Sequence, residues 1–427
     1  MTKRIVRELK SGEYGEFVDI VSLAYPGMKL SAKKDKENLE KRLKLSVKES
    51  EGDVSAVGIF EGEELLGGAL YYKFKMNNRK EIVPMAGIGL VAVSLLKKKE
   101  HVAKDLLQHF LEYFKGKNYE IASLYAFSPE FYKKMGFCFG TRFFCFKGKP
   151  SSFTNYKVKS HLRYAVLKDA DKLHKCYDLF ARKNHGMFLR KKKNFEKSLK
   201  EGAVKYLVYE DGGRIKGYMA FGLKNTWKEN FLREQMDVHI MIADEADVIR
   251  EFSTFLHTQK DQIDRIEVDA YDPDFIHLLS DPRDGSENLR PLVAHQVATD
   301  NTAMMYRILD AKKFIERIVK SRGKSDCPPF KLKITDNFIS DNSREINVFP
   351  DKAIISDKGN ANIIIKVDIM NLSAFLTGVM KLQKLHSYGL IEVSIADHKK
   401  NSVDSLFLKK IDNYLGHNEY PICLTPF

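Results

Sequence analysis

An order of strands and helices that occurs twice along the chain constrains its fold most strongly. Ser55 to Phe74, SAVGIFEGEELLGGALYYKF, contains two β-rich runs joined by an acidic-glycine turn, which is typical of a β-hairpin. The later stretch YLVYEDGGRIKGYMAFGL has the same character. In it, four residues reproduce the spacing of Glu61, Gly62, Leu65 and Gly67, namely Asp211, Gly212, Ile215 and Gly217.

The segments after each hairpin also correspond. A strand, a helix and a further strand follow the first hairpin, with the strands at Ile82 to Val93 and Ile121 to Phe127. The same order follows the second, with strands at Met236 to Ile242 and Arg265 to Ala270. The sequence therefore predicts one mixed-sheet α/β unit used twice.

The rest of the chain predicts a third unit of a different kind. The stretch Ser321 to Pro329, SRGKSDCPP, is typical of a linker. Beyond it we expect strands such as Glu345 to Phe349 and Ala361 to Val367, a helix from Ser373, and a final strand in YPICLTPF. The predicted domains are residues 1–150, 151–322 and 330–427.

Composition narrows the class of protein. The formal charge of +14 is compatible with a nucleic-acid partner, but the basic runs lie far apart without interleaved aromatic residues, so we interpret them as solvated faces. The five cysteines and twelve histidines are scattered, which argues against a disulfide framework and a metal site. No apolar run approaches the length needed to cross a bilayer, so we expect a cytoplasmic protein that has no membrane contact.

The stretch VAVSLLKKKEHVAKDLL, Val91 to Leu107, predicts a strand, a basic turn and an amphipathic helix. A positive turn at a helix N-terminus is suited to a phosphate-bearing ligand. Together with SPEFYKKMGF, which follows the next strand, this order resembles the acetyl-CoA-dependent GNAT N-acetyltransferases. With MYRILDAKKFIERI and VDIMNLSAFLTGVMKLQKLHSYGLIEV, the whole chain resembles the Eis family. That family combines an active GNAT domain, a degenerate one and a sterol-carrier-protein-like domain.

The resemblance implies an acetyl-CoA site in residues 90–103. Backbone groups of Leu90, Val91, Ala92 and Val93 would meet the pantetheine arm, and the pyrophosphate would lie against Lys97, Lys98, Lys99, His101, Val102 and Ala103. The sequence departs from the family pattern at three positions: Lys98 stands where arginine is usual, Leu95 replaces a proline and His101 replaces a glycine. The His101 side chain either obstructs the phosphate or rotates away and donates a hydrogen bond to it. A solvated, lysine-capped helix is the alternative.

The resemblance also implies the catalytic groups. Tyr132 would be the general acid that protonates the thiolate, and the α-carboxylate of Phe427 would be the base. The alternatives are that Tyr132 is a wall residue beside Phe131 and Phe137, and that the terminal segment is simply packed in the third domain.

Three hypotheses for function follow. The first is acetylation of amines on cationic small molecules, with aminoglycosides as plausible acceptors and a hexameric assembly implied by the family. The second is a degenerate acetyltransferase that serves as a binding or scaffold protein, and the third is a nucleic-acid binder. In the second unit, the turn Ala243 to Asp247 places three carboxylates where the anion would have to lie, so we expect no acetyl-CoA there.

Overall fold

The computed structural model describes residues 4–226, 234–291, 293–359, 361–395, 405–425 and 427. The chain divides into two compact units. Unit 1 consists of Met1–Gly140, Met304–Pro421 and Pro426–Phe427, and unit 2 consists of Thr141–Ala303 and Ile422–Thr425. No helix of the described residues is long and apolar enough to span a membrane.

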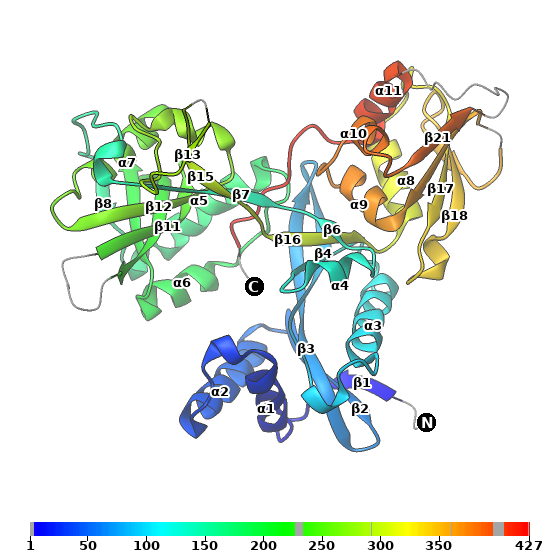
Figure 1. Cartoon of the computed structure of the whole chain (residues 1–427), viewed down its shortest axis with the longest axis horizontal. Coiled ribbons are helices and arrows are strands. Elements are labelled where there is room, and N and C mark those ends of the chain that lie inside the picture. The colour runs from blue at the N-terminus through cyan, green and yellow to red at the C-terminus, as the bar shows by residue number, and fades with distance from the viewer. Residues whose placement is uncertain (1–3, 227–233, 292, 360, 396–404, 426) are drawn as a thin grey trace. The chain divides into compact units, whose positions relative to one another are not determined.

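The N-terminal part of unit 1 is built on a mixed sheet with the strand order β1-β2-β3-β4-β5-β16-β6 (Figure 1). Its strands are β1 (Arg4–Glu8), β2 (Val54–Glu61), β3 (Glu64–Asn78), β4 (Glu81–Val93), β5 (Ile121–Tyr125), β6 (Cys138–Phe139) and β16 (Met304–Ile308). Neighbours are antiparallel except β4 and β5, which run parallel. The predicted hairpin and both predicted strands of the first repeat are therefore present.

Helices cover both faces of this sheet. They are α1 (Tyr14–Ala24), α2 (Lys33–Glu49), α3 (Val102–Gly116) and the short α4 (Pro129–Lys133), with 3₁₀ turns η1 (Pro26–Met28) and η2 (Leu95–Lys97). Successive strand residues point to opposite faces. Val57 accordingly packs in one core with α3, whereas its neighbour Ala56 packs in another with α1 and α2. Strand β4, around which the candidate site is built, contributes Ala86 and Ile88 to the first core and Ala92 to the second.

The C-terminal part of unit 1 is a smaller α/β domain. Its sheet has the order β19-β18-β17-β20-β21. The strands are β17 (Phe330–Thr335), β18 (Arg344–Phe349), β19 (Ile354–Ser356), β20 (Ile363–Asp368) and β21 (Glu392–Ile395). The helical elements are α8 (Ala311–Arg322), η6 (Ser340–Asn342), α9 (Ile369–Leu376), α10 (Leu382–Ser387) and α11 (Ser405–Leu415). Helix α9 begins four residues before the predicted Ser373, because the Asp368 side chain caps it by accepting from the Asn371 N–H.

Unit 2 repeats the architecture of the first sheet, in the order β15-β7-β12-β11-β10-β9-β8 (Figure 1). Its strands are β7 (Arg142–Gly148), β8 (Leu162–Tyr164), β9 (Lys205–Asp211), β10 (Arg214–Asn225), β11 (Glu234–Ile242), β12 (Ile263–Ala270) and β15 (Ala298–Thr302), with β13 (Leu289–Arg290) and β14 (Ala294–His295) forming a separate pair. The helical elements are η3 (Pro150–Ser152), η4 (Leu167–Asp169), α5 (Ala170–Lys183), α6 (Lys192–Glu201), α7 (Ala246–His257) and η5 (Pro273–Leu278).

At two places a strand pairs in the other sheet and not in the sheet of the strand that precedes it in the chain. Strand β7 follows β6 in the chain but pairs with β12 and β15 in the sheet of unit 2. Strand β16 follows β15 but pairs with β5 and β6 in the sheet of unit 1. The compact units consequently change at Gly140/Thr141 and at Ala303/Met304, whereas the predicted domains end at residues 150 and 322.

Candidate functional site

The parallel strands β4 and β5 separate in the middle of the sheet. Their pairing runs from Met85 opposite Ile121 to Gly87 opposite Ser123 and ends there. Strand β4 nevertheless continues to Val93. Beyond Gly87, the β5-side edge of β4 is not hydrogen-bonded to β5, so its backbone groups are available to a ligand.

A β-bulge lies just past this point of separation. The register between β3 and β4 shifts between Gly68 and Leu70, and Leu90 has a left-handed backbone with φ of 48°. A bulky residue rarely adopts that conformation, and bulges redirect backbone groups out of a ladder. The hydroxyl of Tyr25 donates to the Val91 carbonyl at 2.8 Å, which holds the bulged segment against the end of α1. Of the predicted cofactor-binding strand residues, Leu90 and Val91 form this bulge, and Ala92 and Val93 follow it.

The basic turn after β4 has the backbone shape of an anion-binding loop. The turn η2 is followed by two residues in the left-handed region, Lys99 with φ of 68° and His101 with φ of 64°. Helix α3 starts at Val102, and the His101 side chain makes no capping hydrogen bond. The first N–H groups of a helix have no intrahelical acceptor and carry partial positive charge, which favours an anion at that end. The left-handed φ at His101 gives a second reason why glycine suits this position.

The three lysines of the turn are not equivalent. Lys97 lies 3.5 Å from the Glu64 carboxylate and is only 23% exposed, so part of its charge is compensated. Lys98 and Lys99 are exposed. The predicted phosphate-binding residues Val102 and Ala103 supply the first two amides of α3. The predicted loop residues therefore lie together at one helix N-terminus.

Tyr132 is held in the short helix α4 and lies in the core against which Val91 of the bulge packs. Pro129 opens α4 and fixes its first backbone angle. The Tyr132 side chain is buried, and its pKa is raised well above the ordinary value by burial and then by the neighbouring Tyr25. Its hydroxyl forms no hydrogen bond to another described residue. The phenol is therefore protonated throughout the neutral range, as proton donation requires.

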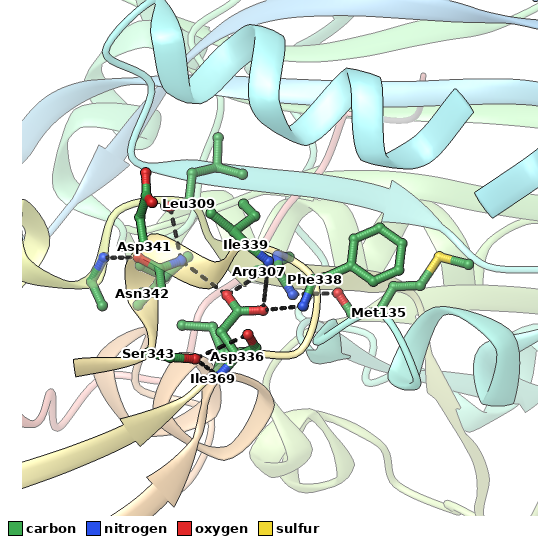
Figure 2. Close-up of polar contacts among 12 residues, drawn as sticks. Met135, Arg307, Leu309, Asp336, Phe338, Ile339, Asp341, Asn342, Ser343 and Ile369 are labelled. Atoms are coloured by element: carbon green, nitrogen blue, oxygen red, sulfur yellow. Dashed lines mark hydrogen bonds and ion pairs between the residues drawn. The ribbon is translucent and has the colours of Figure 1, made fainter. Parts of the chain in front are cut away.

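A buried ion pair supports the turn that follows Tyr132. Figure 2 shows the Arg307 guanidinium between the Asp336 carboxylate and the Met135 carbonyl. Its Nη2 lies 2.7 and 2.9 Å from the two carboxylate oxygens, and both side chains are fully buried. Burial lowers the pKa of Arg307, whereas for Asp336 the attraction of Arg307 and the hydrogen bonds outweigh burial, so its pKa is also below its ordinary value. Gly136 has a φ of 80°, and a Cβ there would overlap the guanidinium.

The last residue of the chain lies on the sheet where β4 and β5 separate. The Phe427 ring packs against three aromatic rings, with centroids 5.1 Å from Tyr72, 4.8 Å from Phe74 and 5.3 Å from Tyr125. An added Cβ at Gly87 would come within 3.0 Å of this ring. The terminal residue is thus near the end of the β4–β5 pairing and is not merely packed in the C-terminal domain.

The predicted final strand, YPICLTPF, is wrong. The described residues of this segment have no regular secondary structure. Within unit 2 the tail is held by separate bonds: the Ile422 N–H donates to the His185 carbonyl, and the Tyr271 hydroxyl donates to the Cys423 carbonyl. The hydroxyls of Tyr177 and Thr425 are 2.7 Å apart. Individual side-chain and backbone bonds thus replace the ladder that a strand would need.

Sequence reasoning did not find the aromatic and arginine residues of this region. Tyr72, Phe74 and Tyr125 carry no motif, and Arg307 lies in MYRILDAKKFIERI, a stretch that contributed only to the family resemblance. The alternation in YYKF predicts only that Tyr72 and Phe74 share a strand face. That the chain terminus would join them depends on pairing over hundreds of residues, for which a single sequence gives no signal.

The corresponding helix start in unit 2 has the opposite charge. Glu245 is the N-cap residue of α7, with Asp244 before it and Asp247 in the first turn. Each carboxylate has a basic partner: Asp244 pairs with Lys183, Glu245 with Lys216, and Asp247 with Arg250. The pairs lie in exposed surroundings, where they leave a phosphate little favourable field.

The separated strands, the bulge and the helix N-terminus all lie in a segment that matches a known family. Residues 5–140 and 186–308 each match a family model for an acetyltransferase (GNAT) domain, and residues 312–419 match one for a sterol carrier protein domain. The chain therefore contains two GNAT acetyltransferase domains, a fold that implies acetyl-CoA as co-substrate. No match was found among curated proteins.

Solved structures share the fold over the full length. The GCN5-related N-acetyltransferase from Anabaena variabilis aligns with a TM-score of 0.76 at 18% identity over 100% of each chain. That from Kribbella flavida gives 0.75 at 17% identity over 100% of this chain and 99% of the other. Eis1 from Mycobacterium abscessus gives 0.72 at 18% identity over 100% of each. In domain content and order, the resemblance to the Eis family is confirmed.

Proposed function

We propose that the N-terminal domain transfers an acetyl group from acetyl-CoA to a primary amine of a cationic small molecule, with aminoglycosides as the first acceptors to test. Two observations carry this proposal. The Phe427 ring lies beside Gly87, where the β4–β5 pairing ends, and Tyr132 neighbours Tyr25, which bonds to the Val91 carbonyl in the bulge. A general acid, a terminal carboxylate and free backbone amides are the groups that amide formation from a thioester requires.

Each group has a step in the reaction. The α-carboxylate of Phe427 accepts a proton from the ammonium group, and the neutral amine attacks the thioester carbonyl. Backbone N–H groups of the segment from Leu90 to Val93 stabilise the oxyanion. The carbon–sulfur bond then breaks, Tyr132 gives its proton to the thiolate, and the proton that the nitrogen loses as the amide forms restores the phenol. Because phenol is a weaker acid than a thiol, the position of Tyr132 has to do most of this work.

The surroundings of the terminus support a cationic acceptor. The rings of Phe427, Tyr72 and Phe74 pack together into an aromatic wall, and Phe427 carries the carboxylate that we propose as the base. Aromatic faces attract ammonium groups within about 6 Å, and the carboxylate adds a full negative charge. A ring system that carries several ammonium groups could bind to the aromatic faces and to the carboxylate.

The backbone of the basic loop supports binding of the pyrophosphate at the N-terminus of α3. The left-handed backbone at Lys99 and His101 and the open amides of α3 are the features that favour an anion there. The replacement of glycine by His101 is also the observation that favours the second candidate, a scaffold protein whose cofactor loop no longer binds.

One titration tests both candidates. Untagged protein is titrated calorimetrically with acetyl-CoA at moderate salt, with His101→Gly in parallel. We expect saturable binding by the wild type, followed by acetylation of amine acceptors detected as release of free thiol. Binding by His101→Gly alone would instead identify a disabled loop and favour the scaffold role.

A further inference from the structure

Arg4, at the start of β1, contacts the cofactor loop through its side chain. Its Nη1 donates to the Glu100 carbonyl at 2.7 Å and to the Asp105 carboxylate at 2.8 Å. The Glu100 and Glu61 carboxylates lie 3.8 and 3.9 Å from the same guanidinium. With 22% of its side chain exposed, Arg4 is partly shielded from water.

The bond to the Glu100 carbonyl orients a backbone amide. Glu100 lies between Lys99 and His101, the two left-handed residues of the loop. The peptide bond from Glu100 to His101 is trans, so its C=O and N–H point in opposite directions. Fixing the carbonyl toward Arg4 therefore turns the His101 N–H away from Arg4 and holds the strained backbone in one conformation.

The ion pairs remove an electrostatic conflict. Asp105 is in the first turn of α3 and Glu100 precedes the helix, so both carboxylates lie near the place where a pyrophosphate would bind. Unpaired, they would repel it. Arg4 offsets part of their combined charge, which leaves more of the local field to Lys98 and Lys99.

The geometry points to Arg4 as a positioning residue for the pyrophosphate loop: it orients the His101 amide and offsets part of the negative charge of Glu100 and Asp105. This inference rests on the proposed function, since it concerns the same acetyl-CoA site. The test compares Arg4→Met with wild type, using acetyl-CoA and acetyl-pantetheine, which lacks the pyrophosphate.

We expect Arg4→Met to raise the Kd and KM for acetyl-CoA by about ten-fold or more, with kcat changed less than two-fold. The kcat/KM for acetyl-pantetheine should stay at the wild-type value, because that donor does not use the loop. Arg7→Met is the matched control: Arg7 is in the same strand but pairs with Glu13 and stacks on Phe60. It should leave both donors unaffected.

Two further variants keep the inference testable if Arg4→Met folds poorly. Arg4→Lys retains the charge without the guanidinium fork and should bind acetyl-CoA less tightly than wild type. Adding Glu100→Gln and Asp105→Asn to Arg4→Met should recover part of the lost affinity. A Kd for Arg4→Met within two-fold of wild type, or an equal loss with acetyl-pantetheine, would overturn the role of Arg4. Failure of the wild type to bind acetyl-CoA would overturn the proposed function itself.

Discussion

At the scale of single residues, Tyr132 combines burial with a hydroxyl that has no hydrogen bond among the described residues. Burial raises its pKa, so the phenol keeps its proton across the neutral and mildly alkaline range. If turnover declined with rising pH below about pH 10, deprotonation of Tyr132 would not be the cause. The burial that keeps Tyr132 protonated also makes it a weaker acid, which places the emphasis on its geometry.

Replacing Tyr132 with phenylalanine removes the proton donor and little else. We expect kcat to fall by about 10²- to 10⁴-fold while the Kd for acetyl-CoA stays unchanged. Tyr119→Phe is a suitable control, because Tyr119 packs on Phe114 at the other end of α3. Steady-state kinetics and calorimetry measure both quantities. A Tyr132→Phe enzyme with more than a third of wild-type kcat would remove Tyr132 from the mechanism.

The terminal carboxylate is tested by a one-residue change in length. Adding a single glycine after Phe427 converts that carboxylate into a neutral amide and leaves the ring in place. We expect kcat to fall by about 100-fold with little change in Tm. The same glycine added before Met1 serves as the control. Equal turnover by the extended and native proteins would show that Phe427 has only a packing role.

At the scale of elements, strand β4 has no room for a side chain at Gly87. A Cβ at this position would lie 2.6 Å from the Phe74 ring and 3.0 Å from the Phe427 ring. Gly87→Ala should therefore displace the rings, lower kcat/KM by about ten-fold or more, and destabilise the fold by about 1–3 kcal/mol. Gly116→Ala is the control, since a Cβ there meets nothing within 4 Å. Unchanged kinetics in Gly87→Ala would separate the ring position from catalysis.

The buried ion pair between Arg307 of β16 and Asp336, which follows β17, leads to a prediction about the free energy of unfolding. Arg307→Met leaves a buried carboxylate unpaired and should cost about 3–5 kcal/mol in urea unfolding. Arg307→Met with Asp336→Asn should cost less, because no charge remains. The pKa of Asp336 is lowered, so the pair's contribution is fully present above about pH 4 and is lost as the pH falls further. A double variant less stable than Arg307→Met would contradict this account.

The sequence predicts elements better than it predicts their pairing. The hairpins and the helix from Val102 are confirmed because hydrophobic periodicity and turn residues are local signals. The left-handed Leu90 has no such signal, since a bulky residue rarely adopts that conformation, and a single histidine is too weak a signal to place His101 there. The β7 and β16 pairings were missed because a repeated sequence suggests two self-contained units. The tail residue Phe427 was placed by resemblance alone.

At the scale of the whole molecule, two similar domains raise the question of how many cofactors bind. Lys98 and Lys99 flank the first helix start, whereas Asp244, Glu245 and Asp247 flank the second. We therefore expect calorimetry to give one acetyl-CoA per chain. Lys98→Glu with Lys99→Glu should abolish that binding event. A stoichiometry near two would show that the acidic turn of unit 2 does not exclude the ligand.

The membership of β16 in the first sheet has a consequence for the order in which the protein is made. On the ribosome, the N-terminal 140 residues emerge long before Met304–Ile308, the strand that pairs with both β5 and β6. Until then the nascent domain has an open edge at β5, and such edges invite pairing with other chains. Translation has to pass residue 308 before the first acetyltransferase sheet can close, so truncated products should aggregate rather than function.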